Sequence, residues 1–179
     1  MARIPYADLN NPEAKPLVDR IIAERGDVLH LYRMLLQSPP VAEGWLNYLT
    51  AIRQKCQLSG ALRELVIMRV AQVNGAPYEA DQHRPIALKE GVSQAQLDAL
   101  ADWTKQPGVF DETQQAVLAY TDAMTKQIHV PDDVAQAVRE KFDHRQLVEL
   151  TATIAAYNMV SRFLEAMAIH SDDDPNVTS

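Results

Sequence analysis

The sequence has little cysteine and little glycine, and both shortages exclude kinds of protein. Cys56 is the only cysteine among 179 residues, so one chain can form neither an internal disulfide framework nor a cysteine-rich zinc site. The 6 glycines and 10 prolines fall between apolar segments, and the chain has no low-complexity segment. With 47% hydrophobic residues, it is long enough for one ordinary domain with a sizeable core.

An excess of basic charge and long apolar runs are absent as well. The chain has 17 Lys+Arg against 24 Asp+Glu, which gives a net charge of −7 and argues against a dedicated nucleic-acid binder, since that class shows a basic face. Residues 1–8 lack the apolar core of a signal sequence. The longest uncharged run near the end, 150–161, is much shorter than the roughly 20 residues that cross a bilayer. We therefore expect a cytoplasmic protein that binds neither nucleic acid nor a membrane.

What the sequence does contain is helical periodicity. Apolar residues recur with a period of 3.6, and few stretches alternate with a period of two. Glycines predict helix ends at Gly26 and Gly75, a capping box predicts a helix start at Ser93, and the residues from Asp111 to Gln114 predict another. These patterns predict an all-α fold of about eight or nine helices. The expected segments are 12–25, 29–37, 41–55, 60–74 and 78–90, followed by helices that begin near 93, 111, 131 and 143.

The chain is expected to form a single domain, 1–179, with three parts. The stretch 56–60 reads as a break, so residues 1–55 are interpreted as a helical extension packed on a core at 56–170. The last residues, 171–179, contain three consecutive aspartates followed by proline. They are expected to be a frayed acidic tail, because chain ends with few apolar residues have little to pack against.

A carboxylate and an imidazole lie four residues apart in the fifth predicted helix. Glu79 and His83 therefore share one helix face, where a carboxylate can fix the ring tautomer and raise the pKa of the imidazole. Glu64 lies on the preceding predicted helix, and the turn at 75–77 can fold that helix back toward the pair. Two carboxylates and an imidazole predict a proton relay for acid–base catalysis.

Other interpretations of these residues stay open from spacing alone. A Glu–His pair at this spacing is commonly a surface contact worth a few tenths of a kcal/mol. Arg63 or Arg69 could neutralise Glu64 without any catalytic role. Glu64, Glu79 and His83 could also hold iron or manganese, although we expect no metal.

The stretch 64–92 contains an ordered set of residues: Glu64, a small-residue turn that follows eleven residues later, Tyr78-Glu79, His83, Pro85-Ile86-Ala87-Leu88 and Gly91-Val92. In this order and spacing it resembles the carboxymuconolactone decarboxylase family, whose superfamily also contains alkylhydroperoxidase D. The segment 157–163 is similar to the family's final helix, and the resemblance covers roughly residues 46–169. It implies an alkylhydroperoxidase-D-like helical fold.

Peroxidase members of this superfamily carry Glu-x(11)-Cys-x-x-Cys-x-x-x-His, in which the two cysteines form the reducing dithiol. In this chain Ala76 stands at the first cysteine position and Glu79 at the second, between Glu64 and His83. Cys56 lies outside the motif and is interpreted as a small, buried or half-buried apolar residue. Without a thiolate at either position, peroxide reduction has no nucleophile. The resemblance therefore points to the branch that lacks the cysteines.

That branch implies a lyase or isomerase that acts, without metal or organic cofactor, on a small carboxylated lactone or a related intermediate of aromatic catabolism. His83 would then be the acid–base group, with Glu79 and Glu64 orienting or poising it. The resemblance also implies a homo-oligomer, a trimer or hexamer. Ala80, where relatives without cysteines often carry tryptophan, and the N-terminal extension depart from the family pattern and leave the substrate open. The alternatives are an alkylhydroperoxidase-like antioxidant protein and a non-catalytic binding protein on the same scaffold.

Three further residues are candidates for binding the substrate. Arg162 is predicted to bind a substrate carboxylate, because a guanidinium group can donate two parallel hydrogen bonds to it. The alternative for Arg162 is an ion pair with Glu165 or Glu149. Tyr78 and Asn158 are candidate hydrogen-bonding residues, for which plain packing roles also stay open.

Overall fold

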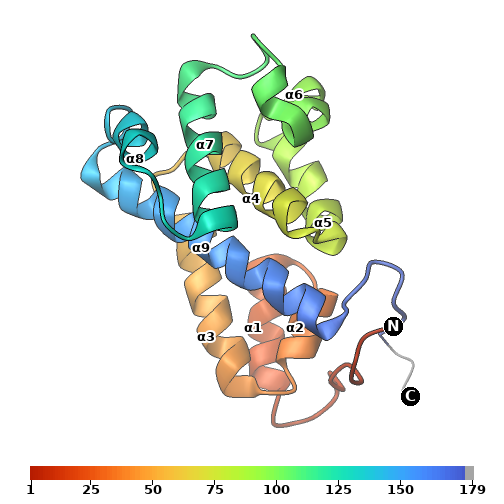
Figure 1. Cartoon of the computed structure of the whole chain (residues 1–179). Coiled ribbons are helices and arrows are strands. Elements are labelled where there is room, and N and C mark those ends of the chain that lie inside the picture. Colours follow the sequence, from red (N-terminus) through yellow and green to blue (C-terminus); the bar gives the residue numbers. More distant parts are fainter. Residues whose placement is uncertain (176–179) are drawn as a thin grey trace. The chain divides into compact units, whose positions relative to one another are not determined.

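The computed structural model describes residues 1–175, and this part of the chain contains helices and no strands (Figure 1). The predicted all-α class is therefore confirmed. Within these residues no helix is both long enough and apolar enough to cross a membrane. The α-helices of the described chain are α1 (Lys15–Arg25), α2 (His30–Leu35), α3 (Pro39–Thr50), α4 (Gly60–Asn74), α5 (Pro77–Lys89), α6 (Gln94–Ala99), α7 (Glu112–Gln127), α8 (Asp132–Arg139) and α9 (His144–Met167).

Local signals in the sequence determine several helix ends. Ser93 and Asp111 each accept a hydrogen bond from the third residue of their helix, whose glutamine side chain returns one. The predicted capping box at Ser93 is therefore confirmed, and the helix start predicted at Asp111 has the same cap. α1 and α4 end at Gly26 and Gly75, which have φ angles of 86° and 63°. Glycine adopts this left-handed backbone without steric cost, and both predicted stops are therefore confirmed.

Two of the predicted helices change form near their ends. The helix expected at 41–55 consists of α3 and a short π-helix, η1 (Ala51–Lys55). The helix expected to begin near 93 consists of α6 and a 3₁₀ segment, η2 (Leu100–Lys105), in which Asp102 leaves the helical region at φ −117° and ψ 36°. Apolar periodicity does not separate these helix types, because one turn is too short to reveal a different period.

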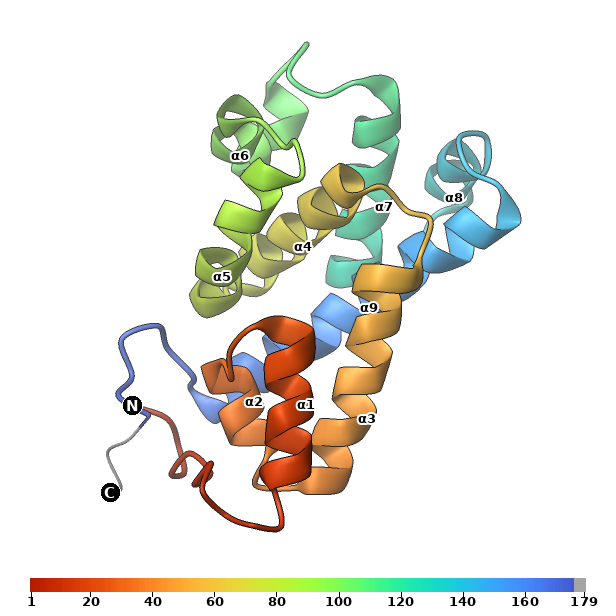
Figure 2. The ribbon, with the colours of Figure 1, turned by 180° about the vertical axis from the view of Figure 1, so that it is seen from behind.

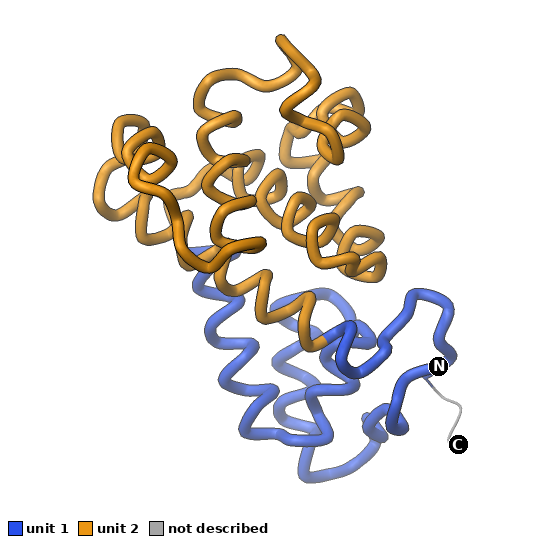
Figure 3. Tube along the Cα trace, in the orientation of Figure 1, with its two compact units in different colours: residues 1–55, 164–179 blue, residues 56–163 orange. Residues whose placement is uncertain are grey.

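The described residues form two compact units, which Figure 3 colours separately. Unit 1 contains residues 1–55 together with the chain from residue 164 onward, and unit 2 contains residues 56–163. Residues 164–170, which were expected in the core, thus belong to the unit of the N-terminal helices. Within unit 1, α3 packs against both α1 and α2.

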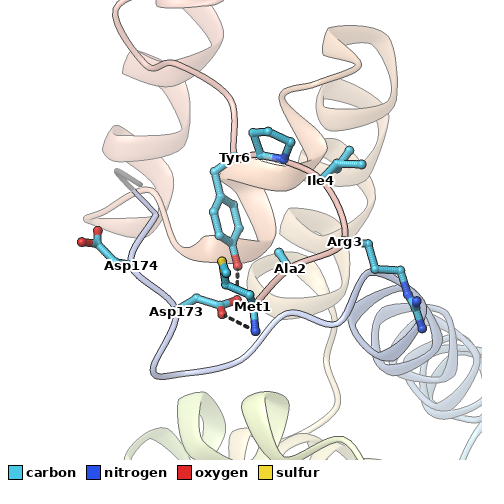
Figure 4. Close-up of a pocket in the computed structure, with 8 residues that line it drawn as sticks. Met1, Ala2, Arg3, Ile4, Tyr6, Asp173 and Asp174 are labelled. Atoms are coloured by element: carbon cyan, nitrogen blue, oxygen red, sulfur yellow. Dashed lines mark hydrogen bonds and ion pairs between the residues drawn. The ribbon is translucent and has the colours of Figure 1, made fainter. Parts of the chain in front are cut away.

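Asp173 ties the end of unit 1 to its beginning. Its carboxylate accepts a hydrogen bond from the Tyr6 hydroxyl at 2.7 Å and pairs with the α-amino group of Met1 at 3.3 Å (Figure 4). These residues line a small cavity of about 50 Å³. The Asp173 carboxylate thus has partners within the stretch 171–179, where the sequence predicts a frayed acidic tail. Residues 176–179 lie outside the described part.

Unit 2 is built around α4, against which α5 and α7 pack (Figure 2). Residues 64–71 of α4 are all buried, which is typical of a helix with neighbours on every side. Its apolar residues Leu65 and Met68 join a core cluster with Leu97 and Leu118, from α6 and α7. Glu64 lies in the same buried run, so its carboxylate needs partners within the protein.

Candidate active site

The turn between α4 and α5 brings the predicted acid–base residues together. Gly75 ends α4 in the left-handed conformation, and Pro77 begins α5, where its missing N–H removes no helical hydrogen bond. The chain reverses over these few residues, and α5 packs along α4. As the sequence predicts, Glu64 of α4 reaches His83, which lies one helical turn after Glu79.

His83 lies between two buried carboxylates. Its Nδ1 is 2.6 Å from Oε2 of Glu64, and its Nε2 is 3.3 Å from Oε1 of Glu79. The three residues are nearly inaccessible, with exposed fractions of 5% for His83, 0% for Glu64 and 4% for Glu79. The Glu79–His83 pair is therefore not a solvated surface contact. Charges and hydrogen bonds act more strongly here than they would in water.

The position of the proton on His83 follows from the state of Glu64. Burial raises the pKa of Glu64, but the hydrogen bond and charge of His83, with the charge of Arg63, outweigh burial and lower that pKa below its ordinary value of 4.5. An ionised carboxylate only accepts hydrogen bonds, so Nδ1 carries the proton of the 2.6 Å contact. Nε2 and Glu79 can then exchange a second proton while Nδ1 stays protonated.

Arg63 places a permanent positive charge beside Glu64. Its Nε donates a hydrogen bond to Oε1 of Glu64 at 3.1 Å, and its Nη2 lies 3.6 Å from Oε1 of Glu90. Glu90 is packed so closely on Gly60 that a Cβ there would stand 1.6 Å from its Oε2. The first turn of α4 and the end of α5 thus hold the guanidinium group. The interpretation that an arginine neutralises Glu64 is correct for Arg63.

The same interpretation is wrong for Arg69, which pairs with Asp122 of α7 instead. Its Nε and Nη2 contact the two carboxylate oxygens of Asp122 at 2.6 and 2.7 Å. Its Nη1 donates to the backbone oxygen of Leu100 at 3.0 Å. Burial raises the pKa of Asp122, but its hydrogen bonds, with that from Arg69 the strongest, lower it below the ordinary value of 3.8. Arg69 therefore links α4, η2 and α7.

Tyr157 of α9 contacts His83 and is missing from the sequence-based list of site residues. The two rings meet edge to face, with centroids 5.2 Å apart and an angle of 88° between their planes. The sequence places Tyr157 only on the apolar stripe of the last helix, and the stripe does not say which neighbour it meets. Tyr78, which the sequence does nominate, is buried in the first turn of α5.

Two predicted substrate-binding residues, Asn158 and Arg162, meet each other in a polar cluster on α9. Nη1 of Arg162 donates to Oδ1 of Asn158 at 2.8 Å. Asn158 also donates to Thr125 at 3.0 Å and accepts from the Asn74 side chain at 3.1 Å. Asn158 is buried, whereas Arg162 is exposed. The cluster therefore orients a guanidinium group at the surface of unit 2.

Glu149, one of the alternative partners considered for Arg162, holds the loop that carries Cys56. Its carboxylate accepts hydrogen bonds from the backbone N–H groups of Gln57 and Leu58 at 2.6 and 3.1 Å, and it pairs with Arg145 at 2.9 Å. Cys56 is free and half-buried. Burial and the charge of Glu149 raise the pKa of its thiol, so little thiolate is present at neutral pH.

The geometry also bears on the metal-binding alternative. Among residues 1–175, no group of three or more His, Cys, Asp or Glu side chains is arranged to hold a metal ion. Each ring nitrogen of His83 faces a different carboxylate, so the three groups form a line and do not converge on a common point.

Comparison with known proteins identifies relatives by sequence. The model of the carboxymuconolactone decarboxylase family matches residues 39–123. The uncharacterized protein YnjA of Escherichia coli (strain K12) is 32% identical over 130 residues, which cover 70% of this chain and 66% of that protein. This chain thus spans about two thirds of the length of YnjA.

Solved structures of other proteins have the same helical fold. The alkylhydroperoxidase AhpD core of Ralstonia eutropha JMP134, an uncharacterized peroxidase-related protein, superposes with a TM-score of 0.81 at 18% identity, over 99% of this chain and 95% of that one. The debrominase Bmp8, in a variant with a cysteine replaced by alanine and 2,3,4-tribromopyrrole bound, has a TM-score of 0.79 at 17% identity, over 96% and 92%. At these identities the similarity establishes the helical fold alone.

Proposed function

The chain belongs to the carboxymuconolactone decarboxylase family, in the superfamily of alkylhydroperoxidase D, and we propose that it is an acid–base enzyme of that family. We propose a lyase or isomerase reaction on a small carboxylated lactone, or on a related intermediate of aromatic catabolism. The observation that carries the proposal is the buried line Glu64–His83–Glu79, in which a carboxylate occupies the position of the second peroxidase thiol.

The chemistry of decarboxylation needs what this line of residues offers. When an unsaturated lactone acid loses CO₂, the carbon–carbon bond to the carboxylate breaks and its electron pair enters the conjugated system. A proton must then be added at carbon, and the reaction consumes one proton overall. The proton held between Nε2 of His83 and Glu79 can be donated in this step and replaced from water. An isomerase would use the same pair to remove a proton and return it at another carbon.

Substrate binding needs a cation for the carboxylate, and we propose Arg162 for this role. Asn158 holds one nitrogen of its guanidinium group, which leaves other N–H donors for a ligand. Tyr157, which precedes Asn158, contacts His83. This turn of α9 therefore adjoins both the acid–base residues and the cluster that holds Arg162. Replacing Arg162 by alanine is expected to raise KM more than it lowers kcat, because it removes binding and not proton transfer.

The main alternatives make different demands on this chain. A thiol peroxidase would depend on Cys56, whose thiol is half-buried and has a raised pKa. A non-catalytic binding protein would not need His83 to exchange a proton. Each alternative therefore predicts a different response to Cys56→Ser and His83→Gln.

The experiment follows the ultraviolet absorbance of carboxymuconolactone, and of a panel of unsaturated lactones and β-keto acids, with purified protein. We expect one or more of these compounds to be consumed by the wild type and by His144→Ala, which alters an exposed histidine. His83→Gln should abolish the signal. Release of one CO₂ per turnover would identify a lyase, and turnover without CO₂ would identify an isomerase. Equal activity of His83→Gln and the wild type would overturn the proposal.

We further propose that the protein is a cytoplasmic homo-oligomer, a trimer or hexamer. Support comes from large apolar side chains that α9 leaves uncovered in a single chain, with Val148 67% and Met159 37% exposed. A free cysteine fits a reducing compartment. Sedimentation equilibrium tests the assembly, for which a monomer mass of 20.0 kDa at micromolar concentration would be the contrary result.

A further inference from the structure

The two carboxylates beside His83 have different surroundings, and Arg63 contacts the one on the Nδ1 side. On the Nδ1 side, Glu64 is fully buried, lies 2.6 Å from the ring and receives a hydrogen bond from Arg63. On the Nε2 side, Glu79 lies farther away, at 3.3 Å, in the first turn of α5. One carboxylate is therefore held by a permanent cation, and the other lies at a longer distance from which a proton can transfer.

We infer that Arg63, held by Glu90, is the positioning residue that keeps Glu64 ionised and so directs proton exchange to Nε2 of His83 and to Glu79. This inference rests on the proposed acid–base function and adds the direction of proton transfer. Arg63 acts only through Glu64 and needs no contact with a substrate.

The anchoring of Arg63 supports this role. Its side chain is 12% exposed, so water screens its charge less than that of a typical surface arginine. Glu90 contacts its other end at 3.6 Å and is itself packed against Gly60. Glu90 thus positions Arg63, and Arg63 in turn positions Glu64, which contacts His83.

The charged and titratable groups around this line come from four places. α4 contributes Arg63 and Glu64, and α5 contributes Glu79 and Glu90. α9 contributes Tyr157, whose ring edge meets the imidazole. The loop before α4 carries Cys56, which is near enough to Arg63 for that charge to lower its pKa, together with the opposing pair of Glu149 and Arg145.

Two substitutions should shift the titration of His83 in opposite directions. Arg63→Gln removes a positive charge near Glu64 and His83, so the midpoint of the His83 titration should rise by about one pH unit. Glu90→Gln removes a negative charge from the same cluster, so the positive charge of Arg63 is opposed less and the midpoint should fall. Arg63→Lys keeps the charge and should restore the wild-type midpoint at least in part. A merely structural role would not reverse the sign.

The measurement is a pH titration of ¹⁵N-histidine-labelled full-length protein by NMR, in which the His83 signals are those missing from His83→Gln. Arg84→Gln is the matched control, because Arg84 follows His83 directly but is exposed and contacts only an exposed partner, Asp98. We expect a protonated Nδ1 and an exchanging Nε2 in the wild type, and no shift in the control. If Arg63→Gln does not fold, Glu90→Gln carries the test.

Unchanged midpoints in both Arg63→Gln and Glu90→Gln would overturn the inference, as would a neutral tautomer with the proton on Nε2. These readouts need no substrate. A protein that titrates as expected but turns over no compound would refute the proposed function, and a catalytically active protein with unchanged midpoints would refute only the role of Arg63.

Discussion

α4 carries two buried ionic clusters, and their difference explains why only one of them suits proton transfer. Arg69 binds Asp122 through both carboxylate oxygens, and Asp122 also accepts hydrogen bonds from Trp103 and Lys126 at 3.2 and 3.0 Å. Both members of this pair keep their charge at neutral pH, because a guanidinium group stays protonated and the hydrogen bonds to Asp122 lower the pKa of that carboxyl. A cluster of this kind holds α4 to α7 but contains no group that exchanges a proton readily near neutral pH.

The cluster around Glu64 also contains an arginine–carboxylate pair, but it differs in the groups that the carboxylate contacts. Arg63 and Glu64 form this pair. Glu64 in addition contacts the imidazole of His83 at 2.6 Å, and the other nitrogen of that ring lies 3.3 Å from Glu79. Histidine is the side chain whose ordinary pKa lies near physiological pH. The two clusters show that burial and charge pairing alone do not indicate a reactive site. What distinguishes the second cluster is a histidine that lies between two carboxylates.

The largest effect should come from His83→Gln. Glutamine keeps hydrogen-bonding atoms between the two carboxylates but cannot exchange a proton near neutral pH, so turnover of an identified substrate should fall by about 10²–10⁴-fold. Steady-state kinetics measures this loss. A fall of less than about threefold would remove His83 from the proposed chemistry.

Arg69→Ala should show the opposite profile, with a large loss of stability. It leaves the half-buried Asp122 with only Trp103 and Lys126 as hydrogen-bond donors and removes the hydrogen bond to Leu100, which should lower the free energy of unfolding by about 1–3 kcal/mol. Urea denaturation measures this loss, and Arg84→Ala, at an exposed pair, should cost less than about 1 kcal/mol. Equal losses in the two variants would contradict the structural role of Arg69.

Acid should weaken both clusters. The pKa values of Glu64 and Asp122 lie below their ordinary values of 4.5 and 3.8, so the unfolded chain binds more protons than the folded one at low pH. Stability should therefore be fully present above about pH 4.5 and decline as the pH falls through the folded pKa values, by up to about 1.4 kcal/mol per pH unit for each group. Urea titrations between pH 7 and pH 3 measure the decline. Asp122→Asn should make it shallower, and an unchanged slope would count against the pairing.

Cys56→Ser should have the smallest effect. The thiol is half-buried, outside both clusters and poorly ionised, so we expect a change in unfolding free energy within about 0.5 kcal/mol and no change in turnover. Denaturation and kinetics run in parallel with His83→Gln check this. Loss of activity in Cys56→Ser alone would favour thiol chemistry.

The sequence predicts the parts of the molecule that local signals control. The bounds of α4, 60–74, agree with the expectation because Ser59 caps its start and Gly75 ends it. The meeting of Glu64 and His83 is also predictable, since a short turn between two helices leaves α5 little choice but to fold back along α4.

Contacts between distant segments could not be predicted in this way. Periodicity places Tyr157 and Asp122 on helix faces but does not say which residue of which helix they meet. The same limit applies to Glu90, whose contact with Arg63 depends on how the end of α5 packs near the start of α4. The assignment of residues 164–170 to unit 1 likewise depends on tertiary packing.

The most direct test compares wild type, His83→Gln and Cys56→Ser on two substrates: carboxymuconolactone in D₂O, and an organic hydroperoxide with a thiol reductant. Acid–base chemistry predicts one solvent deuteron per product in the wild type and in Cys56→Ser, accompanied by CO₂ if the enzyme is a lyase and not if it is an isomerase, with no product in His83→Gln. Reduction of the hydroperoxide that disappears in Cys56→Ser and persists in His83→Gln would contradict the account.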